Sequence, residues 1–412
     1  MADIYPFRAY RYAPQAGPLE NLVTQPYDKI TPDMQRRYLS LSPHNLVRII
    51  LGERFPDDSP SDNVYTRAAR YLCEWIQQGL FIQEPQPCLF AYFQEFPVPD
   101  TGERLVRKSF IGLGPVEDYS AGIVHRHEHT LSGPKQDRLK LLRHTRTHFE
   151  QIFMLYPDPA GEVDRVLDEA ASEKPVASVT DEYGAVHTLW RIAEPVWISA
   201  IQHAMWDKKL IIADGHHRYE TALAFRNEHP ELDDARKLMM TFVNLDSPGL
   251  RILATHRLVG EADVDAFLKT AASEFRLTPL AALGGLLDAW KEPHPAIVRI
   301  GVAAAPDRLY LLEAPRAPET LDVSFLHARI LKDLLGIGEE DVKNEKRIRY
   351  MRGAEAAFQE VRQGQAALAF LLEPVSVHEV ARIALAGGVM PQKSTDFYPK
   401  LMSGLTAYRL EK

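Results

Sequence analysis

The chain has 412 residues, of which 45% are hydrophobic and 25% charged, and its formal net charge at pH 7 is −8. This composition is ordinary for a globular protein of two or three domains, and the negative charge argues against broad nucleic-acid binding, although it leaves a local basic patch open. No apolar run approaches the ~18 residues of a membrane span, no signal peptide is visible, and Cys73 and Cys88 fit neither a disulfide framework nor a metal site. We therefore expect a cytoplasmic protein with no membrane partner.

Helices and strands are predicted to alternate through the first half of the chain. Thr31 as N-cap and Pro32 at the first position predict a helix that ends near Leu41. The apolar run 46–51 predicts a strand, and an apolar helical face that ends at Gly79 predicts a helix. Further strands are predicted at residues 87–96, 107–116, 151–157, 185–192 and 209–213, and further helices at 135–149 and 160–173.

The pattern changes after residue 258, where we place a domain boundary. A helix is predicted at 263–275, followed by a hairpin of strands at 296–304 and 307–314, and late strands at 367–374 and 405–410. The alternation predicts an α/β (mixed α+β) fold. We expect domain 1–258 to carry a nucleotide or phosphate site. A smaller α/β domain, 259–412, is expected to pack closely on it, and its loop 390–404 to return to the site.

The stretch KLIIADGHHRYETALAF, residues 209–225, joins a predicted buried strand to a predicted helix. Gly215 permits a tight turn and a close approach of the backbone to a ligand. The first N–H groups of a helix attract anions, Arg218 suits a phosphate, and His216 and His217 are able to carry charge or move protons. The turn therefore predicts a phosphate cradle. The alternative is a capping Asp214 with ordinary surface histidines.

Five segments in the same order as in a known family carry a resemblance that spans nearly the whole chain. The chain resembles the family known as domain of unknown function 1015, and its D-G-H-H-R turn is similar to the phosphate-binding element of the ParB/sulfiredoxin superfamily, which includes free serine kinases. The resemblance implies that serine is an acceptor and that Tyr27, Asp28, Asn45 and Arg48 bind substrate. The segments are QPYDKIT (25–31), NLVR (45–48), RHEHT with KQDR (126–138), IADGHHRYETAL (212–223) and MPQKSTDFYPKLMSGL (390–405).

A second polar constellation lies in RHEHTLSGPKQDR, residues 126–138. Glu128 is a candidate general base or cation ligand, and Lys135 and Arg138 are candidate phosphate ligands. His127 and His129 are two residues apart, which does not match the HExxH zinc motif. The alternative is a solvated charged loop.

Two further loops have the residue types of a binding site. Tyr27 and Asp28 precede a helix, where Asp28 is able to face substrate or Mg²⁺ or simply to cap a proline turn. Lys393, Ser394 and Thr395 are phosphate-compatible but lack the glycines of a Walker A motif, so a tied-down C-terminal loop is the alternative. The basic run 343–352 predicts a solvated face, and nucleic acid is not an expected partner.

These patterns favour a phosphotransferase that moves a phosphoryl group between a nucleotide, ATP or ADP, and a small hydroxy metabolite such as serine. Glu128, Asp214 and His217 are the expected catalytic residues, and Gly215, His216 and Arg218 the expected phosphate ligands, with Mg²⁺ bridging the phosphates. Segments 126–138, 214–218 and 392–395 are expected to converge on one pocket. A phosphatase or other hydrolase and a non-catalytic ParB-like nucleotide-binding regulator remain alternatives, and the sequence predicts no oligomeric state.

Overall fold

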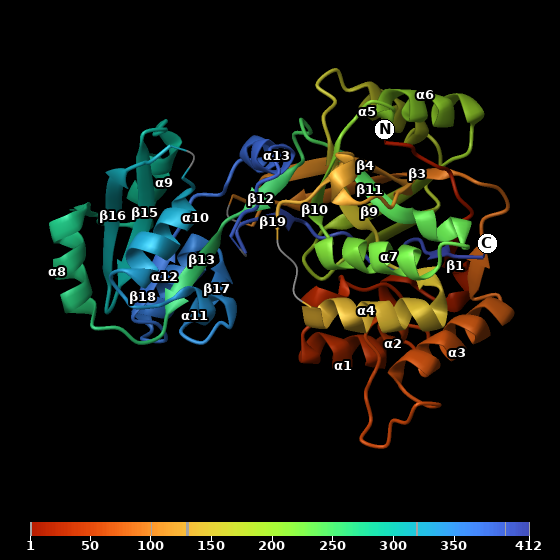
Figure 1. Cartoon of the computed structure of the whole chain (residues 1–412), viewed down its shortest axis with the longest axis horizontal. Helices are drawn as coiled ribbons and strands as arrows, with labels where there is room; N and C mark the ends of the chain where they lie inside the picture. Colours follow the sequence, from red (N-terminus) through yellow and green to blue (C-terminus); the bar gives the residue numbers. More distant parts are fainter. Residues whose placement is uncertain (1, 100, 129–131, 319, 392, 412) are drawn as a thin grey trace. The chain divides into compact units, whose positions relative to one another are not determined.

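The computed structural model describes residues 2–99, 101–128, 132–318, 320–391 and 393–411, and its fold is mixed α/β, as predicted (Figure 1). The chain divides into two compact units. Unit 1 comprises Met1–Arg251, Ala381–Val389 and Pro399–Lys412, and unit 2 comprises Ile252–Val380 and Met390–Tyr398. The chain first leaves unit 1 near residue 251, close to the expected boundary at 258, and later returns to it twice.

Unit 1 is built on an eight-stranded mixed sheet with the order β5-β10-β7-β11-β4-β3-β9-β8. Strands β7 and β10 are buried along nearly their whole length, which explains their continuous apolar sequences. The bounds of the strands are β3 Leu89–Pro97, β4 Arg104–Pro115, β5 Val124–His125, β7 Ile152–Tyr156, β8 Ala177–Thr180, β9 Val186–Ile192, β10 Leu210–Asp214 and β11 Lys237–Asn244.

Helices of unit 1 cover this sheet and extend beyond it. Helix α4 packs beside α7 and also contacts α3, while α5 packs against α6 (Figure 1). The bounds are α1 Pro32–Leu41, α2 Val47–Ile50, α3 Val64–Gln77, α4 Ser132–Thr145, α5 Glu162–Ala170, α6 Pro195–Met205 and α7 His216–Glu228. Short 3₁₀ helices occupy Pro14–Ala16, Leu19–Asn21, Tyr27–Lys29, Tyr119–Ala121 and Asp233–Arg236.

Unit 2 contains a six-stranded sheet with the order β14-β16-β15-β18-β13-β17. The predicted hairpin is confirmed, since β15 and β16 pair antiparallel along their full length. The strands are β13 Thr255–Val259, β14 Arg276–Pro279, β15 Ile297–Ala304, β16 Arg308–Pro315, β17 Ile348–Arg352 and β18 Leu368–Leu371. The helices are α8 Val264–Glu274, α9 Leu283–Lys291, α10 Asp322–Phe325, the π-helix η6 Leu326–Lys332, α11 Glu339–Lys343 and α12 Ala354–Arg362.

The remaining described elements are pairs of short strands and one helix. The strand predicted over 405–410 is shorter in the structure, where β20 has only two residues and pairs with β6. The helix predicted over 135–149 is α4, which ends at Thr145 because β6 begins at Thr147. The bounds are β1 Tyr10–Tyr12 with β2 Phe81–Gln83, β6 Thr147–His148 with β20 Tyr408–Arg409, β12 Arg251–Leu253 with β19 Asp396–Tyr398, and α13 Val377–Leu385.

The strand predicted at 46–51 is wrong, because residues 47–50 form helix α2. The side chain of Asn45 accepts a hydrogen bond from the backbone N–H of Val47 at 2.9 Å and so starts a helical turn. Ile49 and Ile50 are both buried in the same core cluster. A short run with five apolar residues around the single Arg48 has too little periodicity to separate a strand from a buried helical turn.

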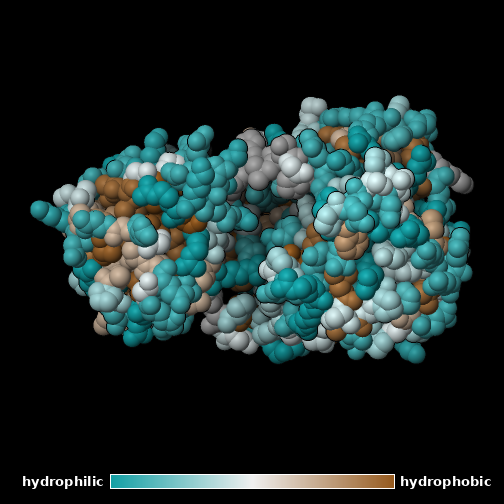
Figure 2. Space-filling model, turned by 90° about the horizontal axis from the view of Figure 1, so that it is seen from below, coloured by the Kyte–Doolittle hydropathy of each residue, from teal (hydrophilic) through white to brown (hydrophobic). Residues whose placement is uncertain are grey.

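The described residues contain no helix long and apolar enough to cross a membrane. The face drawn in Figure 2 is mostly hydrophilic, and its hydrophobic side chains form separate patches.

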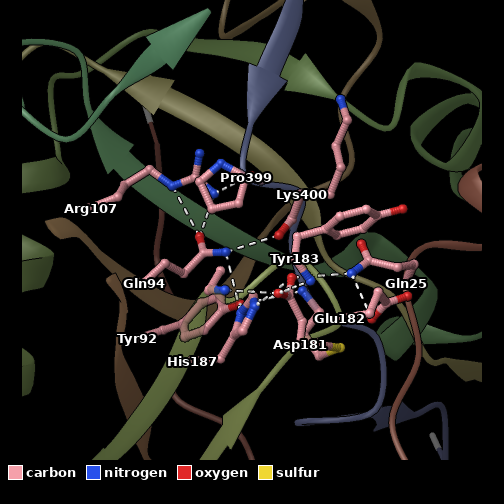
Figure 3. A network of polar contacts seen from close by, with 12 residues as sticks. Gln25, Tyr92, Gln94, Arg107, Asp181, Glu182, Tyr183, His187, Pro399 and Lys400 are labelled. Atoms are coloured by element: carbon pink, nitrogen blue, oxygen red, sulfur yellow. Dashed lines mark hydrogen bonds and ion pairs between the residues drawn. The ribbon is translucent and has the colours of Figure 1, made fainter. Parts of the chain in front are cut away.

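A buried polar network in unit 1 anchors the last segment of the chain to the sheet (Figure 3). Arg107 on β4 donates to the side-chain oxygen of Gln94 at 3.0 Å and to the backbone oxygen of Pro399 at 2.6 Å. Gln94 in turn donates to the backbone oxygen of Lys400 at 2.9 Å. Two adjacent carbonyl groups of the C-terminal segment are therefore hydrogen-bonded to side chains of neighbouring strands.

The network continues from the sheet into a loop. His187 lies 2.6 Å from the hydroxyl of Tyr92 and 3.3 Å from the carboxylate of Asp181. The same carboxylate accepts a hydrogen bond from Gln25 at 3.2 Å. The predicted motif at 25–31 is thus connected to the strands that hold Pro399.

Arg107→Met should destabilise unit 1 much more than Arg104→Met, its neighbour on the same strand. Arg107 is fully buried, and its loss leaves the oxygens of Gln94 and Pro399 without their donor, at a cost of about 1–3 kcal/mol each. Arg104 is 54% exposed in a surface pair with Glu95, so its loss should cost less than about 1 kcal/mol. Urea unfolding followed by tryptophan fluorescence measures both. Equal midpoints for the two variants would contradict the anchoring role.

Candidate functional site

The junction between β10 and α7 is built around Gly215. This glycine has a φ of 99°, in the left-handed region, and precedes the first residue of a helix of 13 residues. A Cβ at this position would lie 3.1 Å from Nη2 of Arg218 and 3.2 Å from Cδ1 of Ile152. The turn therefore needs a glycine for both its backbone conformation and its close packing. It places Asp214 at the end of the strand, next to the first N–H groups of the helix.

Asp214 is held between two cations. One carboxylate oxygen lies 3.2 Å from Nζ of Lys400, and the other accepts a hydrogen bond from Arg218 at 2.9 Å. Burial acts to raise the pKa of Asp214, but the charges of Lys400 and Arg218 outweigh burial and hold this pKa below its usual range. Asp214 is therefore an ionised anchor and a weak proton acceptor.

Arg218 is itself a structural cation. It donates to the backbone oxygen of Gln151 at 2.7 Å as well as to Asp214, and its side chain is only 11% exposed. Burial acts to lower its pKa, but the nearby carboxylates of Glu150 and Asp214 raise it above the usual value. The guanidinium of Arg218 thus links Asp214 of β10 to the residue before β7. Its role as a phosphate ligand stays a prediction.

Glu150 connects the loop at Tyr27 to this junction. Its carboxylate accepts the backbone N–H of Tyr27 at 3.0 Å and the hydroxyl of Ser403 at 3.3 Å. The guanidinium of Arg138 lies 4.1 Å from the ring centroid of Tyr27 and 4.0 Å from Glu150. A cavity of about 50 Å³ is lined in part by Arg138, Glu150 and Arg218. The structure therefore places Arg138 and Arg218 at one cavity, with Tyr27 against Arg138, and the convergence of all three predicted segments stays a prediction.

A pair of buried histidines lies beside the junction. The rings of His127 and His216 meet edge to face with centroids 4.7 Å apart, and Nδ1 of His127 lies 2.8 Å from the backbone oxygen of Ile212. Burial lowers the pKa of His127 to about 4 and holds that of His216 well below its usual value. Both rings are therefore neutral at pH 7, and the 3.9 Å contact of His216 with Glu128 is a polar contact between a neutral ring and a carboxylate.

The more exposed groups at the junction are His217, Asp28 and Lys135. Burial lowers the pKa of His217, while the charges of Glu220 and Asp28 act to raise it. Lys135 forms an ion pair with Glu220 at 2.8 Å, and Asp28 lies 3.4 Å from Lys29. These groups have the chemistry for binding anions and moving protons, and each of the two lysines already has a carboxylate neighbour.

Two other predicted site residues, Asn45 and Arg48, form side-chain hydrogen bonds to the protein's own backbone. The side chain of Asn45 donates to the backbone oxygen of Asn21 at 2.8 Å, and Arg48 donates to that of Leu39 at 2.9 Å. Both interactions hold the loop around α1 and α2, and they leave substrate binding by Asn45 and Arg48 a prediction from the resemblance alone.

The predicted segment 392–395 belongs to unit 2, whereas 126–138 and 214–218 belong to unit 1. Ser394 donates to the backbone oxygen of Pro391 at 2.6 Å, and the backbone oxygen of Lys393 accepts from Arg257. Residues 129–131 and 392 lie outside the described part of the chain. Convergence of 392–395, including Thr395, with the other two segments stays a prediction.

The described residues include no group of three or more His, Cys, Asp or Glu side chains placed to hold a metal ion. Mg²⁺ in nucleotide sites is commonly held by only one or two carboxylates together with phosphate oxygens. The hard oxygen donors of Asp28 and Asp214 have the right chemistry for that arrangement. They would hold the ion only in company with a ligand's phosphates, and when bound it would supply positive charge.

Two residues of the site were missed by the sequence analysis. Lys400 lies within the segment 390–405 that carries the resemblance, and its position after Pro399 in a polar loop was the available signal. Glu150 lies between a predicted helix and a predicted strand, and no local pattern distinguishes it from any surface glutamate. Its burial, with 7% of the side chain exposed, appears only in the folded chain.

A family model described as "Protein of unknown function (DUF1015)" matches residues 4–330. No curated protein matches the chain. Among solved structures, a free serine kinase in complex with AMP is similar at 10% identity and a TM-score of 0.38, over 73% of this chain and 90% of that one. SbnI from Staphylococcus aureus, with a C-terminal truncation, is similar at 11% identity and a TM-score of 0.35, over 71% and 85% of the two chains. A conserved hypothetical protein from Pyrococcus furiosus is similar at 11% identity and a TM-score of 0.34, over 67% and 87%.

The buried, neutral state of His127 predicts a pH dependence of stability. Its pKa is about 4 in the folded chain and about 6.5 in an unfolded one, so between these values the unfolded state binds the extra proton. Stability should therefore fall as the pH falls from 6.5 towards 4, with a contribution from this residue of about 1.4 kcal/mol per pH unit.

His127→Asn keeps a donor for the backbone oxygen of Ile212 and removes the titration. The variant should show a shallower loss of the free energy of unfolding across this range than the natural protein, measured by urea unfolding at half-unit intervals. The difference between the two proteins at pH 8 gives the cost of the substitution itself, because the ring is neutral there in both states. Parallel curves from pH 8 to pH 4 would mean that His127 is accessible to protons in the folded chain.

Proposed function

We propose that this chain, which belongs to the DUF1015 family of proteins of unknown function, transfers a phosphoryl group between a nucleotide and a small hydroxy metabolite. The supporting observation is the junction at Gly215. There, Asp214 is fixed between Arg218 and Lys400 at the N-terminal end of a helix of 13 residues, with Asp28 and His217 close enough to affect each other's charge. Phosphoryl transfer depends mainly on positioning and charge neutralisation, which this arrangement is suited to supply.

The charge balance at the junction supports a role for Mg²⁺. Each nearby cation is already neighboured by a carboxylate, as in the pairs Lys400–Asp214, Lys135–Glu220 and Lys29–Asp28. A nucleotide adds several negative charges to this balanced set. The helix N-terminus offsets about half an elementary charge of the nucleotide. A divalent cation held with the phosphates is the natural source of the remaining positive charge.

The geometry favours different roles for the three proposed catalytic residues. Asp214 would orient the acceptor hydroxyl without accepting its proton, because the flanking cations keep Asp214 ionised and its proton affinity low. Glu128 has a side chain that is 35% exposed, and its neighbour His216 is neutral, so its carboxylate is better suited to accept a proton from an acceptor hydroxyl. His217 is the next candidate base. Serine as the acceptor is proposed from the family resemblance alone.

Glu128→Gln should lower turnover about 10²–10⁴-fold, because glutamine keeps the size and polarity of the side chain but does not accept the proton. Nucleotide affinity should be unchanged or slightly higher. The assay follows ADP or AMP formed from ATP or ADP with serine and Mg²⁺, and calorimetry measures nucleotide affinity. Glu162→Gln, at an exposed position in the first turn of α5, is the matched control and should leave turnover unchanged.

Three results would contradict parts of the proposal. Phosphate released from phosphoserine without nucleotide would favour the hydrolase alternative. Tight nucleotide binding with no turnover would favour a ParB-like regulator. Full turnover in Glu128→Gln would keep the transferase but move the base to another residue, with His217→Asn as the next variant. Arg218 is a poor choice for such tests, because its loss also removes the hydrogen bond to Gln151.

A further inference from the structure

Unit 2 contains a cavity of about 430 Å³, the size of sites that hold small organic ligands. One side is formed by α10 and the π-helix η6, and the other by α11, the two residues just before it and Pro391. All of its described lining residues belong to unit 2, whereas the junction at Gly215 belongs to unit 1. The lining residues are Ser324, His327, Ala328, Lys332, Ile337, Gly338, Glu339, Val342, Lys343 and Pro391.

The wall of the cavity is partly the hydrophobic core of the unit. Ile337 is a buried member of the core cluster around β15 and β18, and Val342 packs against the same cluster. Ala328 and Pro391 add further apolar surface. A ligand with an apolar body would therefore bury its carbon atoms against side chains that are already dry, which is the usual source of affinity in such sites.

Two polar side chains, those of His327 and Ser324, also line this cavity. Nε2 of His327 is buried and has no hydrogen-bond partner among the described residues. Ser324 lies three residues earlier on the same helical face and also lines the cavity. Burial lowers the pKa of His327 to about 4, so its ring is neutral at pH 7 and is able to donate or accept one hydrogen bond. A buried polar atom without a partner costs about 1–3 kcal/mol, and a rotation of the ring that turns Nε2 into the cavity would let a ligand group remove that cost.

The helix that carries His327 has an unusual geometry at this place. Residues Leu326–Lys332 form a π-helix of seven residues, longer than the single π turn that is typical. π-Helical turns are less stable than α-helical ones and occur frequently at functional sites. The π-helix runs from the residue before His327 to Lys332, so its departure from α-helical geometry coincides with the wall of the cavity.

The charge at the cavity is positive. Lys332 and Lys343 both line it, both are exposed, and within the described part of the chain neither ammonium group has an ion-pair partner. Glu339 is the one carboxylate among the described lining residues. This leaves a surplus of one positive charge at the rim of an apolar cavity, which fits a ligand with one negative charge.

We propose that this cavity binds a small amphipathic carboxylate, with its apolar body against Ile337 and Val342 and its carboxylate near Lys332 and Lys343. His327 and Ser324 then bind a polar group in the interior. This site does not depend on the activity proposed for the junction at Gly215, and its test measures binding alone.

The test uses the full chain and three probes with the same apolar body: octanoate, octan-1-ol and octylammonium. Isothermal titration calorimetry should show binding in the order octanoate, octan-1-ol, octylammonium, because only octanoate matches both the walls and the rim charge. The double variant Lys332→Gln, Lys343→Gln should weaken octanoate about three- to tenfold and leave octan-1-ol unchanged, as expected for two exposed charges.

A second variant locates the binding. Ala328→Trp places a large ring at an exposed position of the cavity wall and should reduce octanoate affinity more than tenfold. Ala272→Trp, at an exposed position of α8 that does not line the cavity, is the matched control and should bind octanoate like the natural protein. Absence of octanoate binding, equal affinity for octanoate and octan-1-ol, or equal effects of the two tryptophan substitutions would each overturn the proposal.

Discussion

The ion pairs of Asp214 with Arg218 and Lys400 are the constraint on which the rest of unit 1 depends. These three residues come from the end of strand β10, the first turn of helix α7 and the segment that follows Tyr398. A buried charge is tolerated only where partners compensate for lost hydration, so each of these elements must arrive in its place for the others to be stable. The hydrogen bonds of Arg107 to Pro399 and of Gln94 to Lys400 also hold this cluster in place, because they fix the backbone from which the Lys400 side chain extends.

The two proposed binding regions differ in how they treat charge. At the Gly215 junction nearly every cation has a carboxylate neighbour, so specificity for an anion would come from the fixed backbone N–H groups and from a metal brought with the ligand. In the cavity of unit 2, Lys332 and Lys343 form no ion pair with any described residue, and Glu339 offsets only one of their two charges, so an anion would be attracted directly. The first arrangement suits a reaction in which charge moves, and the second suits simple retention of a ligand.

Much of the fold followed from the sequence wherever pattern and length agreed. The β10–α7 junction was predicted because an apolar run, a glycine and a helical pattern follow one another within 17 residues, from Lys209 to Phe225. Strand β11 was missed although it lies in the middle of the sheet and although Thr241, Phe242 and Val243 are residue types that favour strands. The site was predictable to the extent that it is local. Polar or glycine-containing neighbours in sequence pointed to Arg138, Tyr27 and Arg218. The roles of Glu150 and Lys400 depend on partners far along the chain, and no spacing rule predicts such a pair.

The interleaving of the two units bears on the order in which the protein is made. A ribosome synthesises Asp214 and Arg218 early, then the whole of residues 252–380, and only afterwards Lys400, which is 186 positions downstream of its partner. A nascent chain that has completed the eight-stranded sheet therefore still lacks one of the two cations at Asp214. Assembly of this charge cluster is thus delayed until the residues of unit 2 between Ile252 and Val380 have been synthesised and Lys400 has followed them, so the junction at Gly215 is completed after most of unit 2 exists.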